Sequence, residues 1–151
     1  MATKSAAVRR VRVGTSLKAK DVMQQPVIAA TPQASLRDIA TQLVTNEFSG
    51  MPVAAPDGRV VGVTTESDIV RALIQGKQLE NLTAVDVMTG PPITVDVNTP
   101  LEDVMKSLED YRIVRVPVTS EDALVGIISR RDVIRVILEP EFMAFGVPLA
   151  D

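Results

Sequence analysis

The chain contains no histidine, no cysteine and no tryptophan, and aromatic residues make up only 3% of it. Without cysteine there is no disulfide, no thiol nucleophile and no thiolate ligand for a metal. Without histidine the chain lacks the side chain that most often serves as a general base or a zinc ligand. These absences argue against a triad hydrolase, a cysteine protease and a zinc enzyme. They leave carboxylate or lysine chemistry, or a protein that binds a ligand without converting it.

The 151 residues suffice for one compact domain or for two small units with a shared core, and 46% of them are hydrophobic. The formal net charge of −3 is unevenly distributed. Residues 1–20 carry six basic residues and no acidic one, whereas residues 21–151 carry ten basic and nineteen acidic residues. We therefore expect a basic leader before an acidic body, and no nucleic-acid surface outside the leader.

The chain contains an internal repeat. Residues 19–74 align with residues 84–138 after one single-residue gap, and about 16 of 55 aligned pairs are identical. The identical pairs include Asp-Val-Met at 21–23 and 86–88, Pro-Val at 52–53 and 117–118, and Val-Gly at 61–62 and 125–126. Duplication of one ancestral unit is the simplest explanation.

Both copies predict the same order of elements. A short opening turn precedes an apolar run that predicts a strand, at 27–30 and 93–97. Ser35 and Thr99 are the expected N-caps of the following helices, with Pro100 at the first helical position of the second copy. Two strands and a closing helix complete each copy; we place them at residues 51–55, 60–65 and 67–75, and at 116–119, 124–129 and 131–138.

These patterns predict an α+β fold built from two β-α-β-β-α repeats. A copy of about 55 residues is marginally stable alone, so we expect the copies to pack sheet to sheet about a pseudo-two-fold axis, with a cleft on each side. The expected parts of the chain are a flexible basic leader at 1–18, repeats at 19–75 and 84–138, a linker at 76–83 and an apolar tail at 139–151.

Three motifs in each copy resemble the cystathionine-β-synthase (CBS) domain. They are Lys-Asp-Val-Met at 20–23 and Val-Asp-Val-Met at 85–88, Ser-Gly-Met-Pro-Val at 49–53 and Val-Arg-Val-Pro-Val at 114–118, and Gly-Val-Thr-Thr-Glu-Ser-Asp at 62–68 and Gly-Ile-Ile-Ser-Arg-Arg-Asp at 126–132. The resemblance extends over residues 19–138. The chain therefore looks like a stand-alone tandem CBS pair, an arrangement also called a Bateman module.

The resemblance implies that AMP, ADP or ATP binds in the clefts between the repeats, with S-adenosylmethionine and NAD as alternatives. Asp68 and Asp132 would bind the ribose hydroxyls, and Thr65 and Ser129 would lie near the phosphate. Each pair begins a helix, where backbone N–H groups with partial positive charge suit a phosphate. Helix capping without ligand contact is the alternative role for these four residues. The apolar residues expected to line an adenine slot are Ile28, Val53, Ile93 and Val118.

The two copies differ in charge around these residues. The second copy carries Arg115, Arg130 and Arg131 where the first has Gly, Glu and Ser. Guanidinium groups neutralise phosphates and bind them bidentately, and a surface role in solvent is the alternative. Thr94 occupies a position where the family often has Thr, whereas the first copy has Ala29. We therefore expect the second copy to bind a phosphorylated adenosine ligand better than the first.

The function that we predict is that of a regulatory module without catalytic activity or cofactor, which senses an adenosine nucleotide and signals to a client protein. A ligand-free dimerisation scaffold is the alternative, because the resemblance also implies homodimers formed through the helices. No apolar run reaches the roughly 18 residues that a membrane span needs, and the leader lacks the apolar segment of a secretory signal. We therefore expect a cytoplasmic protein with no membrane contact. Nucleic acid is not the expected ligand, and nucleic-acid binding through the basic leader is the alternative. The apolar tail is expected to pack on the rest of its own chain or on a second subunit. Binding of a client protein by the tail is the alternative.

Overall fold

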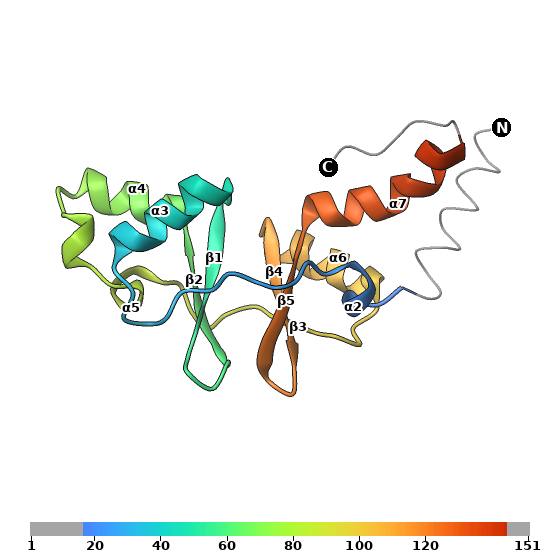
Figure 1. Ribbon diagram of the computed structural model, residues 1–151, viewed down its shortest axis with the longest axis horizontal. Helices are drawn as coiled ribbons and strands as arrows, with labels where there is room; N and C mark the ends of the chain where they lie inside the picture. The colour runs from blue at the N-terminus through green and yellow to red at the C-terminus, as the bar shows by residue number, and fades with distance from the viewer. Residues whose placement is uncertain (1–16, 145–151) are drawn as a thin grey trace. The chain divides into compact units, whose positions relative to one another are not determined.

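The computed structural model of the protein describes residues 17–144, which form two compact units (Figure 1). Residues 26–94 and 119–125 make one unit, which we call the repeat 1 unit. Residues 17–25, 95–118 and 126–144 make the other, the repeat 2 unit. Helices and strands are mixed in both, so the predicted α+β class is confirmed.

The repeat 1 unit contains an antiparallel hairpin and two helices that lie side by side (Figure 1). Its described elements are α3 (Leu36–Asn46), β1 (Gly50–Ala54), β2 (Val60–Thr65), α4 (Glu66–Ile74), the 3-10 turn η1 (Leu79–Asn81) and α5 (Ala84–Val87). Ser35 caps α3 as predicted, because its side chain accepts the N–H of Asp38 at 3.0 Å. Helix α4 follows β2 directly and packs on it.

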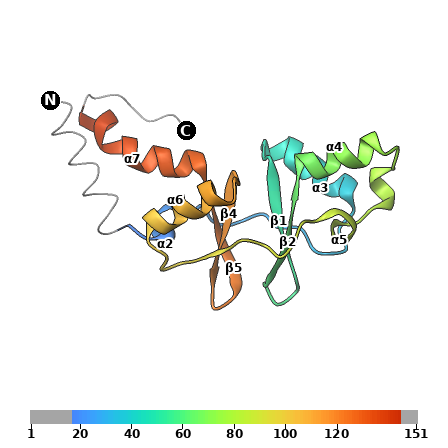
Figure 2. The ribbon, with the colours of Figure 1, turned by 180° about the vertical axis from the view of Figure 1, so that it is seen from behind.

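The repeat 2 unit holds a three-stranded sheet in the order β3-β4-β5. Helices α6 and α7 contact each other, and the short α2 contacts α7 (Figure 2). The bounds of these elements are α2 (Ala19–Val22), β3 (Val95–Asp96), α6 (Leu101–Asp110), β4 (Arg115–Ser120), β5 (Ala123–Ser129) and α7 (Arg130–Ala144). The hairpin tip between β4 and β5 belongs to the repeat 1 unit, where the Leu124 N–H donates to the Gly58 carbonyl at 2.9 Å.

Each core is built from a helix whose apolar side chains recur at helical spacing. Leu36, Ile39 and Leu43 of α3 are at most 3% exposed, and Val53 of β1 lies in the same cluster. The corresponding residues of α6 are equally buried; they are Leu101, Val104 and Leu108. Full burial of one such side chain contributes roughly 1.5–3 kcal/mol. The α3 and α6 faces therefore account for much of the stability of the two units.

The opening segment of the first repeat packs in the repeat 2 unit. Ala19 of α2 is fully buried there. The side chain of Met23 lies over Gly126 of β5, so close that a Cβ on this glycine would be 2.5 Å from the methionine sulfur. Gln24 exchanges two backbone hydrogen bonds with Ile127, at 2.8 and 3.1 Å. These contacts fix the chain just before it enters the other unit.

The opening segment of the second repeat makes the same contacts in the repeat 1 unit. Ala84 of α5 is fully buried, and the side chain of Met88 lies over Gly62 of β2. Thr89 exchanges backbone hydrogen bonds with Val63, at 3.2 and 3.3 Å. Each repeat thus supplies the segment that completes the unit of the other. The exchange brings the Met of each Asp-Val-Met sequence against the Gly of a Val-Gly sequence, and both sequences occur in both copies.

Two local predictions are wrong. Residues 27–30 are not a strand; only Ala30 pairs, in parallel, with Val53. Prolines at 26 and 32 flank this segment and cannot donate to a ladder, which limits the pairing to one bridge. Thr99 does not cap α6, because its hydroxyl accepts the N–H of Asp96 at 3.0 Å. Pro100 occupies the N-cap position instead.

The structure also refines the ends of the repeats. Helix α7 continues to Ala144, past the expected end at residue 138, so the first part of the predicted tail is helical. The 3-10 turn η1 lies in the predicted linker. Leu17 and Lys18, the last residues of the predicted leader, are held in the repeat 2 unit, where the Leu17 carbonyl accepts the N–H of Leu101 at 2.9 Å. The rest of the predicted leader and residues 145–151 lie outside the described residues.

We predict that Gly126→Ala lowers the free energy of unfolding by about 1–3 kcal/mol, because the new methyl group overlaps the side chain of Met23. Chemical denaturation measures the loss. The matched test is the double variant Gly126→Ala/Met23→Ala, in which the shortened side chain makes room for the methyl group. The double variant should lose less than the sum of the two single losses. Additive losses would show that overlap with the Met23 side chain is not the cause of the lost stability.

We predict that Thr64→Val stabilises the protein by about 1 kcal/mol. Thr64 of β2 is fully buried, and its hydroxyl has no hydrogen-bond partner among the described residues. The equivalent residue of repeat 2 is the apolar Ile128, which is equally buried. Valine keeps the shape of threonine and removes the unpaired hydroxyl.

The control for this substitution is Thr41→Val, since the exposed hydroxyl of Thr41 donates to the Arg37 carbonyl at 2.9 Å. Thermal and urea unfolding of both variants give the comparison. A gain at position 41 as large as that at position 64, or no gain at position 64, contradicts the prediction.

Candidate functional site

Both units contain a strand that runs directly into a helix through a hydroxyl residue and an aspartate. Thr65 ends β2 and caps α4, accepting the Asp68 N–H at 3.3 Å. Ser129 ends β5 before α7 and accepts the Asp132 N–H at 3.1 Å. The two predicted site pairs therefore have the same local geometry. Helix capping by these residues is observed in both units.

The carboxylate of Asp68 is held from several sides, and the residue is only 4% exposed. Its Oδ2 accepts hydrogen bonds from the Thr65 N–H at 2.8 Å and from the Thr65 hydroxyl at 3.1 Å. Its Oδ1 accepts one from Arg71 Nη1 at 3.2 Å. A negative charge in this position is stabilised by the N-terminal end of the helix. The aspartate is thus fixed as a hydrogen-bond acceptor in the first turn of α4.

Asp132 is similarly buried, at 5% exposure, and it also accepts three hydrogen bonds, one of them from a distant residue. Its Oδ2 accepts the Ser129 N–H at 2.8 Å. Its Oδ1 accepts hydrogen bonds from Arg135 Nη1 at 3.4 Å and from Gln24 Nε2 at 2.6 Å. Gln24 is a functional candidate that the sequence did not reveal, since it lies 108 residues from Asp132. The only sequence signal is that the other repeat has Thr89 at the aligned position.

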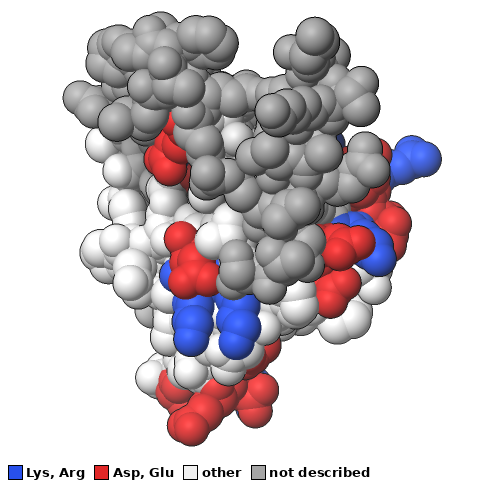
Figure 3. Space-filling view, turned by 90° about the vertical axis from the view of Figure 1, so that its right-hand side faces the viewer, with Lys and Arg blue, Asp and Glu red and all other residues white. Residues whose placement is uncertain are grey.

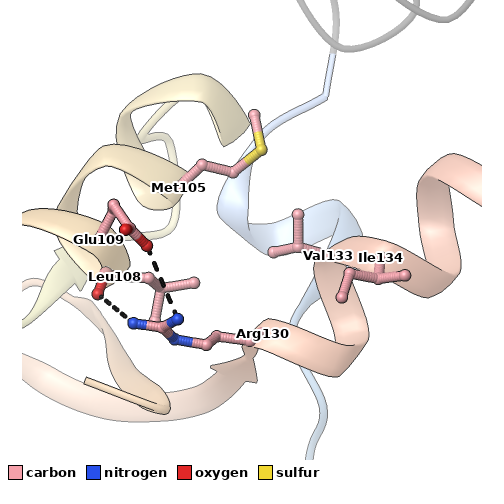
Figure 4. Close-up of a pocket in the computed structure, with 6 residues that line it drawn as sticks. All are labelled: Met105, Leu108, Glu109, Arg130, Val133 and Ile134. Carbon is pink, nitrogen blue, oxygen red and sulfur yellow. Dashed lines mark hydrogen bonds and ion pairs between the residues drawn. The ribbon is translucent and has the colours of Figure 1, made fainter. Parts of the chain in front are cut away.

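Arg130 binds the end of α6. Its Nε donates to the Ile113 carbonyl at 2.9 Å. Its Nη2 donates to the Leu108 carbonyl at 3.1 Å, and its Nη1 lies 3.6 Å from Glu109 Oε2 (Figure 4). A cation at the C-terminal end of a helix complements the helix dipole. Beside it is a small hollow of about 200 Å³ lined by Met105, Leu108, Glu109, Arg130, Val133 and Ile134. A phosphate at Arg130 would have to compete with these contacts.

The other two predicted arginines are placed differently. Arg131 is exposed, and no hydrogen bond or ion pair engages it within residues 17–144. Arg115 begins β4 and is half-buried. Both belong to the repeat 2 unit, together with Ser129 and Asp132. In repeat 1 the residue aligned with Arg130 is the acid Glu66, so the starts of α4 and α7 differ in charge.

The predicted apolar residues divide into two groups. Val53 and Val118 have no exposed surface, so their side chains belong to the core. Ile28 is 40% exposed and Ile93 is half-buried, so these two have surface that a ring could contact. The sequence assigns Thr94 to the second copy. In the structure the residue is exposed, and both it and Ile93 lie in the repeat 1 unit, which also contains Asp68.

Neither a cluster of metal-binding side chains nor a helix able to cross a membrane occurs among the described residues. No group of three or more acidic side chains gathers in this part of the chain to hold a metal ion. None of its helices is both long enough and apolar enough to span a bilayer. On the face drawn in Figure 3, basic side chains lie among acidic ones and form no continuous basic surface.

Several known proteins resemble the chain over most of its length. Hypoxic response protein 1 of Mycobacterium tuberculosis is 28% identical over 128 residues, which are 84% of this chain and 90% of that protein. The crystal structure of Hypoxic Response Protein I with two coordinated zinc ions superposes with a TM-score of 0.73 at 27% identity, covering 79% of this chain and 98% of that one.

Two further crystal structures contain adenosine compounds. A CBS domain protein from Pyrobaculum aerophilum complexed with AMP has a TM-score of 0.73 and 29% identity, covering 82% of this chain and 97% of that one. A CBS domain pair in complex with 5′-methylthioadenosine and S-adenosyl-L-methionine has the same TM-score and identity, covering 82% and 98%. The sequence model of the CBS domain matches twice, at residues 19–75 and 84–139. The chain therefore belongs to the CBS domain family and contains a tandem pair of CBS domains.

Proposed function

We propose that the protein is a regulatory module that binds an adenosine nucleotide of the AMP, ADP or ATP type and signals its presence to a partner protein. The observation that carries the proposal is the duplicated helix start, in which a buried aspartate is fixed beside a hydroxyl residue and backbone N–H groups. Relatives of 29% identity have been solved with AMP and with S-adenosyl-L-methionine, which supports a ligand of this class.

The residues divide the recognition between them. Asp68 and Asp132 are the hydrogen-bond acceptors for the ribose hydroxyls. The first turns of α4 and α7 supply positive electrostatic potential for a phosphate. Arg131 and Arg115 add positive charge in the repeat 2 unit, whereas Glu66 adds negative charge at the start of α4. The repeat 2 unit is therefore the better site for a ligand with phosphate groups.

Such a module regulates by changing the populations of its conformations. A ligand shifts a conformational equilibrium only as far as its affinities for the two states differ. In the repeat 2 unit, Gln24 of the exchanged opening segment donates to Asp132. In the repeat 1 unit, Thr89 of the other opening segment pairs with Val63, two residues before Thr65. A ligand bound in the site would act on the rest of the protein through these segments. We propose that the protein has no catalytic activity, because the site offers only binding groups. We also propose that it is cytoplasmic.

A second candidate function, dimerisation without a ligand, is favoured by the exposed apolar residues of the closing helices. Val70, Leu73 and Ile74 of α4 are 52–81% exposed, and Ile134 of α7 is 57% exposed. Burial of such side chains stabilises an interface, and a second copy of the chain is the occupant that we propose. Dimerisation and ligand sensing are compatible, so the ligand experiment decides whether the module is a sensor or only a scaffold.

We predict that AMP, ADP or ATP raises the midpoint of thermal unfolding. A ligand at 100 times its dissociation constant adds about 2.7 kcal/mol of stability, which corresponds to roughly 5 °C or more for a protein of this size. The panel includes NAD and S-adenosylmethionine as alternative ligands, and ribose 5-phosphate and inorganic phosphate as controls without adenine. A panel in which no adenosine compound shifts the midpoint favours the scaffold.

We predict that Asp132→Ala lowers the affinity for a phosphorylated adenosine ligand more than Asp68→Ala does. Loss of a hydrogen bond to a charged acceptor corresponds to roughly a tenfold change in affinity or more. Isothermal titration calorimetry on both variants gives the two affinities, and their unfolding midpoints show how much each loses as a helix cap. Equal losses, or a loss only in Asp68→Ala, contradict the proposed preference for repeat 2.

A further inference from the structure

The two site aspartates each accept three hydrogen bonds, but these are distributed differently over the two carboxylate oxygens. A carboxylate oxygen has about two lone-pair positions for hydrogen bonds. Oδ1 of Asp132 accepts two donors, Gln24 Nε2 at 2.6 Å and Arg135 Nη1 at 3.4 Å. Oδ1 of Asp68 accepts only Arg71 Nη1 at 3.2 Å among the described residues. Oδ1 of Asp132 is thus filled from within the chain, whereas Oδ1 of Asp68 retains one position; at Oδ2 the order is reversed, with two donors on Asp68 and one on Asp132.

Gln24 is placed so that its side chain can leave while its backbone stays. The two backbone hydrogen bonds with Ile127 hold its main chain. The neighbouring Met23 is anchored over Gly126. The residue itself is exposed, and its amide reaches Asp132 through rotatable side-chain bonds. Rotation about those bonds releases the Asp132 carboxylate without disturbing the exchanged segment.

At the aligned position in repeat 1, the backbone contacts are the same but the side chain does not bind the aspartate. Thr89 has the same two backbone hydrogen bonds, in this case with Val63. No hydrogen bond joins its side chain to Asp68 in the described structure. Both repeats therefore have the two backbone hydrogen bonds to the strand, but only in repeat 2 does the side chain of the bonded residue also reach the aspartate.

We propose that Gln24 is an intramolecular gate on the repeat 2 site. Its amide N–H donates to Oδ1 of Asp132, so a ribose hydroxyl that binds this oxygen must displace it. Both donors are neutral and compete for one lone-pair position on the same carboxylate. The gate weakens ligand binding in repeat 2 and so sets the concentration at which the site fills. This inference rests on the proposed function, because it requires that Asp132 binds a ligand hydroxyl.

The test is Gln24→Thr, which installs the residue that repeat 1 has at this position. The substitution is made in a parent protein that carries Asp68→Ala, so that only the repeat 2 site is measured. Isothermal titration calorimetry with AMP and with ATP should show about tenfold tighter binding after Gln24→Thr, the equivalent of one hydrogen bond to a charged group. Gln25→Ala is the matched control, since this exposed neighbour has no hydrogen bond to Asp132, and its affinity should not change.

The reciprocal variant is Thr89→Gln in a protein that carries Asp132→Ala. The longer side chain should reach Asp68 and weaken binding in repeat 1. Tighter binding in Gln24→Thr, or binding that appears only in Gln24→Thr, supports the gate. Unchanged or weaker binding in Gln24→Thr, in a protein whose Asp68→Ala parent binds, overturns the gate and leaves the proposed function standing. Absence of binding by the wild-type chain and by every variant overturns the proposed function, and the gate with it.

Discussion

The contact between a methionine and a glycine is the constraint on which the rest of this structure depends. Met23 lies over Gly126, and Met88 lies over Gly62. Only a residue without a side chain lets the opening segment approach the strand so closely. The segment then adds its backbone hydrogen bonds to that strand, and its buried alanine fills the space beside it. Because each segment comes from the other repeat, neither unit is complete with residues from one repeat alone.

The site follows from the same strands. Three residues after Gly62 and Gly126, each strand ends in a hydroxyl residue that begins a helix, and the aspartate three residues later is held by that turn. Burial would disfavour a charged carboxylate, but the helix start and the neighbouring arginine compensate for it. The opening segment passes beside this aspartate because it is bonded to the preceding residues of the strand. In the repeat 2 unit, that proximity brings the side chain of Gln24 onto Asp132.

The sequence predicts those features that depend on local pattern. The apolar spacing of Leu36, Ile39 and Leu43 identifies a buried helix face, and the duplicated motifs identify the family. Features that depend on contacts between distant residues are not predictable from one chain. The exchange of opening segments, the capture of Arg130 by the end of α6 and the Gln24–Asp132 hydrogen bond all join residues that no periodicity relates. Where Pro26 and Pro32 interrupt the hydrogen-bonding pattern, an apolar run alone overestimates the strand.

The exchange of segments also limits how the sequences of the two repeats can evolve. After most duplications, two copies are free to diverge independently, because each folds with its own residues. Here a larger residue at position 62 must displace the methionine side chain at position 88, in the other copy, and the same holds for positions 126 and 23. Each repeat thus limits substitutions in its twin. The two copies have drifted apart in charge, yet the Asp-Val-Met and Val-Gly sequences remain letter for letter the same.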